Sequence, residues 1–217
     1  MRQLVVNAFV SLDGVMQALG APEEDPTGGF THGGWSVGYW DEEMMGRMAG
    51  ADPYELLLGR GTYEIFAAHW PYVTGPIADQ LNGTRKHVAS TTLEQLEWNN
   101  STLITTDVAD YVAMLKRQDG PEIQVQGSPG LIQALLEHDL IDEFRIWIFP
   151  LVIGTGKRLF GVGTMPAGLK LVDSEVSKTG VTINTYQRAG DIDSGSFALD
   201  EPTEAEIERR RRLADGQ

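Results

Sequence analysis

Apolar and polar residues follow two different periods along this chain. Apolar runs of strand length occur at residues 4–12, 54–59, 85–90, 101–105 and 122–126. Segments whose apolar side chains recur at helical spacing lie between them, at residues 41–50, 60–70, 107–118 and 129–139. Strands that alternate with helices in this way favour an α/β fold with a mostly parallel sheet.

The pattern changes near the end of the chain, where helical segments are missing. Residues 141–154, 169–178 and 181–188 read as strands, and the last two are expected to form a hairpin around Thr179 and Gly180. The sequence therefore predicts a three-layer α/β domain: a mixed, mostly parallel sheet flanked by helices, with antiparallel C-terminal strands.

The core pattern stops near residue 190. From Asp191 onward polar residues dominate, although Thr203 and Glu206 form a candidate capping box for a short helix. We expect one domain over residues 1–190 and a partly ordered, acidic and Arg-rich extension over 191–217. The run of four arginines in this extension follows several glutamates, so internal ion pairs are expected there.

Composition and charge narrow the function classes. The formal net charge of -14 argues against nonspecific binding to nucleic acid or to an anionic membrane. No apolar run approaches the length of a membrane span, and the N-terminal segment lacks a signal-peptide pattern, so a cytoplasmic protein is expected. The absence of cysteine excludes disulfides, thiolate nucleophiles and zinc–thiolate sites.

The sequence lacks several familiar functional motifs. The segment "LVIGTGKR" lacks the first glycine and the final Ser or Thr of a phosphate-binding P-loop, and no G-x-G-x-x-G follows the first strand. The four histidines have no metal-ligand spacing, so no metal site is expected. No G-x-S-x-G marks a serine nucleophile.

Three joints between a predicted strand and the segment after it carry binding chemistry. In an open α/β sheet, ligands bind beyond the carboxyl ends of the strands, where helix N-termini present free N–H groups. Glycine lets the backbone approach a ligand, and hydroxyls donate hydrogen bonds, although both are also ordinary turn residues. The joints are "LLLGRGTYE", "VASTT" and "IQVQGSPGL".

These joints belong to an ordered series of motifs with a known counterpart. "VSLDGVM", "LLLGRGTYEIFAAHWP", "VASTTL" and "QVQGSPGLIQALLEHDLIDEFRIWIFPLVIGTGKRLF", over roughly residues 1–188, resemble the reductase domain of riboflavin biosynthesis and its stand-alone relatives. The resemblance implies a dihydrofolate-reductase-like fold, NADPH as hydride donor with NADH as an alternative, and a homodimer. It also implies a small substrate with a C=N bond, such as a ribosylated pyrimidine or a pterin-like ring.

The resemblance assigns cofactor contacts to the three joints. Two positions depart from the family pattern: Thr91 stands where NADP-specific members often carry Arg or Lys, and Ser128 stands where the family has a second adjacent glycine. Pro129, at the first helical position, also lacks an N–H for an anion. The implied cofactor-binding residues are Gly59, Arg60, Gly61, Thr62, Ser90, Thr91, Gly127, Ser128, Gly130 and Leu131.

Substrate-side candidates have equally ordinary structural interpretations. Asp13 matches the family's catalytic acid, yet it is also a turn residue. Trp35 could stack on a flat ring or simply pack. Asp41, Glu42 and Glu43 begin the helix where a folate-reducing relative places its carboxylate, and the alignment does not single out one of them; acids also favour a helix N-terminus. Lys157 could meet a substrate phosphate or remain solvated.

Two functions follow as alternatives. The first is an NAD(P)H-dependent oxidoreductase in which the proton comes from Asp13 or from a water that Asp13 orients. Because a carboxyl group of ordinary pKa is ionised at neutral pH, direct donation would need a raised pKa, which favours water. The second function is a nucleotide-binding module of the same fold without turnover.

Overall fold

The structure is a computed structural model that describes residues 1–216. Eight strands form one sheet in the order β4-β3-β2-β5-β1-β6-β8-β7. The strands are β1 (Leu4–Ser11), β2 (Tyr54–Gly59), β3 (Lys86–Ala89), β4 (Ser101–Ile104), β5 (Glu122–Val125), β6 (Glu143–Phe149), β7 (Leu169–Val176) and β8 (Thr182–Arg188). The helices are α1 (Glu42–Ala49), α2 (Arg60–His69), α3 (Pro76–Gly83), α4 (Val108–Lys116), α5 (Pro129–Glu137) and α6 (Glu204–Ala214), with 3-10 turns η1 (Thr27–Gly29), η2 (Val37–Tyr39) and η3 (Trp70–Tyr72).

Strand directions agree with the sequence prediction. Neighbouring strands from β4 to β6 all pair in parallel, whereas β8 runs antiparallel to both β6 and β7. The hairpin between β7 and β8 turns at Gly180, whose φ of 84° suits glycine. The mixed, mostly parallel sheet with antiparallel C-terminal strands is therefore confirmed.

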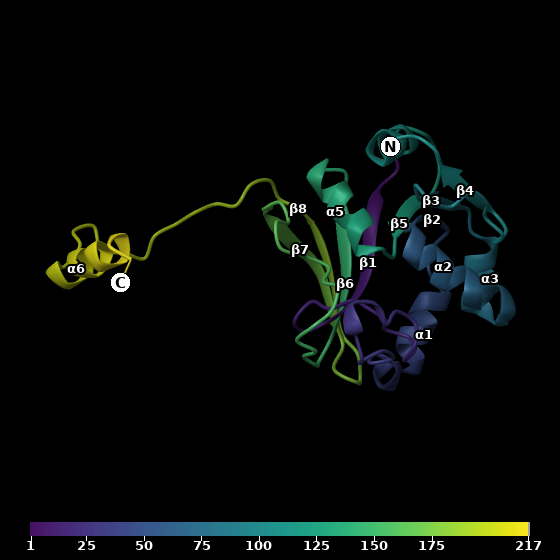
Figure 1. Ribbon diagram of the computed structural model, residues 1–217, viewed down its shortest axis with the longest axis horizontal. Coiled ribbons are helices and arrows are strands. Elements are labelled where there is room, and N and C mark those ends of the chain that lie inside the picture. Colours follow the sequence, from purple (N-terminus) through teal and green to yellow (C-terminus); the bar gives the residue numbers. More distant parts are fainter. Residues whose placement is uncertain (217) are drawn as a thin grey trace.

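Helices cover both faces of the sheet. On one face, Val112 of α4 and Ile132 of α5 belong to the same buried cluster as the strand residues Val6, Leu57 and Val125. On the other face, α2 and α3 pack over β2 and β3, while α1 packs over β1, β6 and β8. Figure 1 shows α1, α2 and α3 together on one side of the sheet.

Local differences from the sequence prediction have simple causes. The strand expected over residues 141–154 ends at Phe149, because Pro150 has no N–H for the ladder. Helix α3, which the sequence analysis did not predict, begins with Pro76 at a favourable first position.

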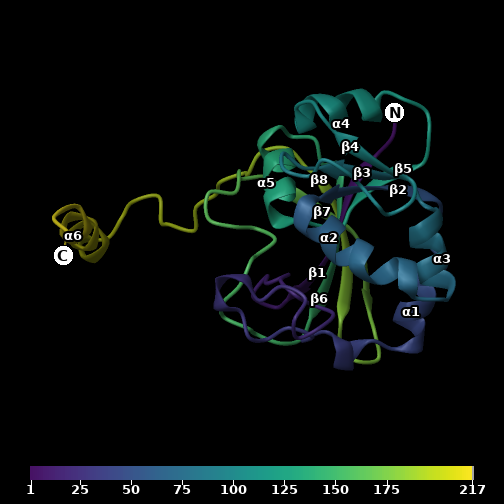
Figure 2. The ribbon, with the colours of Figure 1, turned by 45° about the vertical axis from the view of Figure 1, so that its right-hand side comes forward.

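The C-terminal segment extends away from the sheet as an irregular stretch that ends in α6 (Figures 1 and 2). Thr203 Oγ1 accepts from the N–H of Glu206 at 3.3 Å, as a helix cap does. Glu206 does not complete the capping box, because its carboxylate pairs with Arg209 and Arg210. The expected internal ion pairs are therefore present. No helix within residues 1–216 has the length and apolar character needed to cross a membrane.

We predict that deletion of residues 191–217 leaves the sheet domain folded. No residue of α6 is buried, so the deletion removes little packing energy. The melting temperature should change by less than about 2 °C, which corresponds to under ~1 kcal/mol for a domain of this size. Calorimetry of the full chain and of residues 1–190 measures this directly. A loss of cooperative unfolding would mean that the extension is part of the domain.

Candidate functional site

Two strand-to-helix joints meet at the carboxyl edge of the sheet. Strands β2 and β5 are paired neighbours, and the N–H of Gly59 donates to the carbonyl of Gly127 at 3.2 Å. A Cβ placed on Gly59 would lie 2.2 Å from Ser128 Oγ, and one on Gly127 would lie 2.5 Å from Thr62 Oγ1. Neither glycine can accept a side chain without movement. Their small size therefore brings the first turns of α2 and α5 together.

The N-termini of these two helices are chemically distinctive. Helices α2 and α5 have no side-chain cap and no acidic residue in the first turn. Every other α-helix in the described residues has an acid in its first turn, a side-chain cap, or both. Uncapped N–H groups and the helix dipole make a helix N-terminus positive. The two joints therefore form an electropositive point in an acidic protein.

Space is available beside the free N–H groups. A Cβ on Gly61 or on Gly130, in the first turns of α2 and α5, would meet nothing within 4 Å. Arg60 is 55% exposed at its side chain, and its closest acid is Glu64 at 3.9 Å. Its guanidinium is therefore free to reach an anion at this edge.

The third joint follows β3, which pairs with β2, so it lies at the same edge of the sheet. Ser90 Oγ accepts hydrogen bonds from the N–H groups of Thr92 and Leu93 at 3.2 and 3.0 Å. These bonds stabilise the turn after β3. Thr91 is exposed. Arg85 directly precedes β3, so it lies at the opposite end of that strand and is not part of this joint.

Hydrogen bonds to Asp13 link the end of β1 to the loop after β6. Ser11 Oγ donates to Asp13 Oδ1 at 2.7 Å, and the N–H groups of Ile153 and Gly154 donate to its two oxygens at 3.0 and 2.8 Å. Arg158 contacts the carboxylate at 3.2 Å and also donates to the Asp13 carbonyl. This carboxylate therefore holds two loops together at the carboxyl edge.

These contacts keep the Asp13 carboxyl group ionised at neutral pH. The hydrogen bond from Ser11 holds the pKa of Asp13 well below its usual range, although burial opposes the shift, and the N–H groups of Ile153 and Gly154 add to it. The carboxyl group is ionised at neutral pH and does not donate a proton. The catalytic role of Asp13 stays a prediction; of the two routes inferred from the sequence, the oriented water agrees with an ionised carboxylate.

The long segment before α1 is held in place by polar contacts. The side chain of Gln17 donates to the carbonyls of Asp25 and Thr27 and accepts from the N–H of Lys157 at 3.0 Å. Lys157 Nζ lies 2.6 Å from Asp25 Oδ2. Lys157 thus already has an anionic partner, which leaves its expected contact with a substrate phosphate a prediction without structural support.

The other substrate-side candidates also serve the fold. Trp35 donates its indole N–H to the carbonyl of Gln17 and packs edge-on against Phe149, with ring centroids 5.3 Å apart. Asp41 caps α1 by accepting from the N–H of Met44 at 2.8 Å, while its other oxygen is buried without a partner. Glu43 is exposed. Their substrate contacts stay predictions.

Sequence reasoning missed a cavity of about 620 Å³ on the α1 face of the sheet. Its strand residues share a face because parallel partners in register point the same way: Val5 pairs with Gln124, and Asn7 pairs with Arg145. Polar residues inside otherwise apolar strands were the available signal. The lining includes Asn7, Gly46, Arg47, Asp52, Glu122, Gln124, Gln126, Arg145 and Trp147.

We call this cavity the sheet-face cavity. A cluster of ion pairs lies at one end of it. Both terminal nitrogens of Arg145 donate hydrogen bonds to the Glu122 carboxylate, at 2.8 and 2.9 Å, and its Nε donates one to Glu143 at 2.9 Å. Burial lowers the pKa of Arg145, but the bonds to Glu122 and Glu143 outweigh it, so the pKa is raised. Arg145 stays charged and is paired with both acids.

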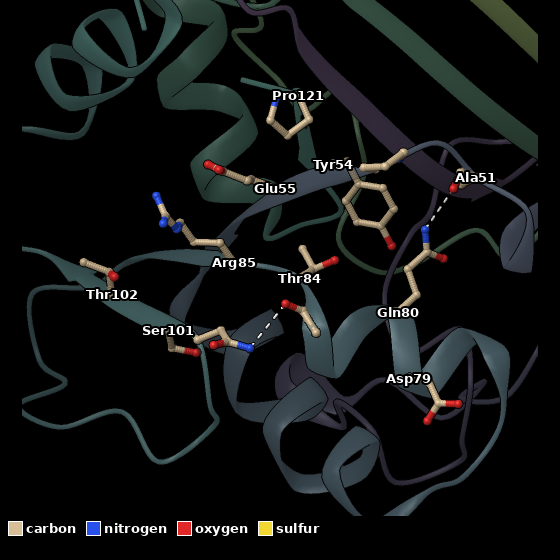
Figure 3. A pocket seen from close by; sticks show the side chains of 13 residues that line it. Ala51, Tyr54, Glu55, Asp79, Gln80, Thr84, Arg85, Ser101, Thr102 and Pro121 are labelled. Carbon is tan, nitrogen blue, oxygen red and sulfur yellow. Dashed lines mark hydrogen bonds between the residues drawn. The ribbon is translucent and has the colours of Figure 1, made fainter. Parts of the chain in front are cut away.

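A second pocket, of about 670 Å³, lies at the end of the strands opposite to the glycine joints (Figure 3). Tyr54 and Ser101 begin their strands, and Arg85 immediately precedes one, so the pocket faces the amino edge. It is separate from the glycine joints and does not contribute to the site at the carboxyl edge. Within residues 1–216, no three His, Asp or Glu side chains gather closely enough to hold a metal ion.

Comparison with known proteins agrees with this architecture. Residues 2–183 match the family model of the RibD C-terminal domain. The uncharacterized protein YyaP of Bacillus subtilis (strain 168) is 25% identical over 198 residues, which span 87% of this chain and 96% of YyaP. The family resemblance inferred from the motifs is thereby confirmed.

Solved structures show the same fold. A protein from Shewanella sp. PV-4 assigned to riboflavin biosynthesis superposes with a TM-score of 0.62 at 25% identity, over 86% of this chain and 99% of that one. Dihydrofolate reductase from Enterococcus faecalis, complexed with NADP(H) and RAB-propyl, superposes with a TM-score of 0.55 at 14% identity, over 86% and 96%. The second likeness concerns the fold alone.

The packing between the joints predicts a coupled pair of substitutions. Gly59→Ala should destabilise the protein by about 1–3 kcal/mol, because the new Cβ collides with Ser128 Oγ. Ser128→Gly in the same chain removes that oxygen and should recover part of the loss. Urea denaturation of the two single variants and the double variant gives the coupling energy. Gly61→Ala, where space is open, is the control and should be near neutral; strict additivity at 59 and 128 would refute the contact.

Asp13→Asn should destabilise the protein at pH 7 by roughly 1–2 kcal/mol, because charge-assisted hydrogen bonds weaken. The folded-state pKa of Asp13 lies below its unfolded value, so its contribution is complete above about pH 4 and declines as the pH falls toward the folded value. The stability gap between wild type and variant should therefore narrow below pH 4 in urea denaturation. The exposed Asp119, changed to Asn, is the control; an unchanging gap would exclude the linkage.

Proposed function

This chain belongs to the RibD C-terminal domain family, and on that premise we propose that it is an NAD(P)H-dependent reductase of a small heterocyclic substrate, either a ribosylated pyrimidine or a pterin-like ring. The observation that carries the proposal is the pair of uncapped, acid-free helix N-termini at adjacent strand ends. Such N-termini bind phosphate groups in α/β proteins.

The residues present fit a dinucleotide. The N–H groups of Gly61 and Thr62 on α2, and of Gly130 and Leu131 on α5, would hold the pyrophosphate, and open space lies beside both glycines. Arg60 would add a charged contact. NADPH is the proposed donor and NADH an alternative, since Thr91 supplies no cation for a 2′-phosphate.

When bound, the nicotinamide would supply the hydride, and the protein's own residues perform the remaining tasks. Asp13 stays ionised and can position a water that gives the substrate nitrogen its proton. The contacts of Gln17 and Lys157 hold the segment before α1 against the carboxyl edge, where it would exclude water from the site. Gln126, one residue before Gly127, links the sheet-face cavity to this edge.

The homodimer implied by the family has support at the edge of the sheet. Strand β7 is the last strand of the sheet, and Leu171, Val172 and Val176 on it are 50%, 43% and 69% exposed. Exposed apolar residues on an edge strand favour association with a second surface. We propose this edge as the dimer contact.

We expect NADPH to stabilise the protein by about 2.7 kcal/mol at a hundredfold excess over Kd. Arg60→Ala should weaken NADPH binding about tenfold, or about 1.4 kcal/mol, because a charged contact to phosphate is lost. Fluorescence titration with NADPH measures the dissociation constants of wild type and variant. Arg85→Ala, at the amino edge, is the matched control and should bind as wild type does.

Several outcomes separate the alternatives. No binding of NADPH or NADH would refute both the reductase and the nucleotide-binding module. Binding without oxidation of NADPH across pterins, flavins and ribosylated pyrimidines would favour the module. An Arg60→Ala variant with unchanged affinity would contradict the phosphate assignment at α2.

A further inference from the structure

The sheet-face cavity contains a polar atom that the protein leaves unpaired. Asn7 is 7% exposed, lines the cavity from the middle of β1, and its Oδ1 is buried without a hydrogen-bond partner. Buried carbonyl oxygens of this kind nearly always accept a hydrogen bond. Because Oδ1 is itself buried, the Asn7 amide has to turn toward the cavity before a ligand N–H can supply the missing partner.

Two neutral amides, in β5 and directly after it, line the cavity together with Asn7. Gln124 is 3% exposed, and its register partner on β1 is Val5, two residues before Asn7 on the same face. Gln126 Nε2 donates to Gln124 Oε1 at 3.3 Å. Because an amide side chain both donates and accepts, Asn7 and Gln126 can pair with a ring that offers an N–H next to a carbonyl.

The cations of the cavity are already engaged. Arg47 forms an ion pair with Glu175. Arg145 is held by Glu122 and Glu143 through three hydrogen bonds. A phosphate that approached either arginine would lie beside the carboxylate already paired with it, at a cost in repulsion.

The surroundings of the cavity reinforce this preference. Asp52 adds a carboxylate to the lining. At the carboxyl edge, Lys157 and Arg158 are paired with Asp25 and Asp13. The charged groups around the cavity therefore offer no unpaired cation to a phosphorylated substrate within the described residues.

We propose that the sheet-face cavity selects a flat, uncharged and unphosphorylated heterocycle whose ring N–H donates to Asn7 Oδ1. This inference rests on the proposed function, since the cavity reaches the cofactor edge through Gln126. It names a substrate class that lacks the phosphate group, with a lactam or imide edge as the recognised feature.

Matched ligands test the two parts of this inference separately. Calorimetric titrations of the full chain, with and without saturating NADPH, would use riboflavin against riboflavin 5′-phosphate and uridine against uridine 5′-phosphate. In at least one pair the unphosphorylated member should bind at least tenfold more tightly. 3-Methyluridine, which lacks the ring N–H, should bind at least tenfold more weakly than uridine if uridine binds. Equal or tighter binding of the phosphates, or no binding of any of these compounds, would overturn the inference.

Two variants locate the binding to this cavity. Asn7→Leu should weaken binding of the preferred compound at least tenfold and leave NADPH affinity unchanged. Gly46→Leu on α1 should block the cavity, since a Cβ there meets nothing within 4 Å and the added side chain can extend into it. Because glycine is unfavourable inside a helix, this variant should melt no lower than wild type. Gly83→Leu, at the end of α3, is the matched control.

The results separate this inference from the proposed function. If NADPH binds and Gly46→Leu leaves heterocycle affinity unchanged, the cavity assignment is wrong while the reductase proposal stands. If the heterocycle binds as described and NADPH does not bind, the reductase proposal fails. If Asn7→Leu does not fold, the Gly46→Leu result decides the location.

Discussion

The contact between the Gly59 and Gly127 joints is the constraint on which the rest of the site depends. Two parallel strands can place helix N-termini side by side only if the chain between strand and helix is narrow, and here each joint presses a side chain against the other's glycine: Ser128 against Gly59, and Thr62 against Gly127. This close approach places two sets of free N–H groups at one point of the carboxyl edge. In a chain of net charge -14, such a point concentrates positive potential where an anion can bind.

The same constraint explains the departure at Ser128. A second glycine is the family's usual residue there, and a serine would be expected to crowd the joint. Gly59 supplies the missing space, because its lack of a Cβ leaves room for Ser128 Oγ. The turn and phosphate interpretations of "GSPG" are therefore compatible: Ser128 begins α5 without capping it, and Pro129 occupies the first position. The N–H groups of Gly130 and Leu131 are left for a ligand.

Much of the fold could be predicted from the sequence because periodicity is local. The apolar spacing of residues 107–118 corresponds to α4, which Asp107 caps, and the expected turn at Thr179 and Gly180 corresponds to the hairpin. The site was harder to predict, because its properties arise between segments. Ser11, two residues before Asp13, has the largest effect on its pKa, but the contributions of Ile153 and Gly154 come from a distant segment. The cavity around Asn7 exists only once β1, β5, β6 and α1 are assembled.

The central claim is that the paired N-termini of α2 and α5 hold a nucleotide pyrophosphate, and that the substrate cavity on the α1 face extends from Glu122, at the start of β5, to Gln126, next to the Gly127 joint. A crystal structure of the full chain with bound NADPH tests this most directly. The account predicts the pyrophosphate within hydrogen-bond distance of the Gly61 and Gly130 N–H groups, with Arg60 turned toward it. A pyrophosphate bound elsewhere, for example in the amino-edge pocket near Arg85, would contradict the account.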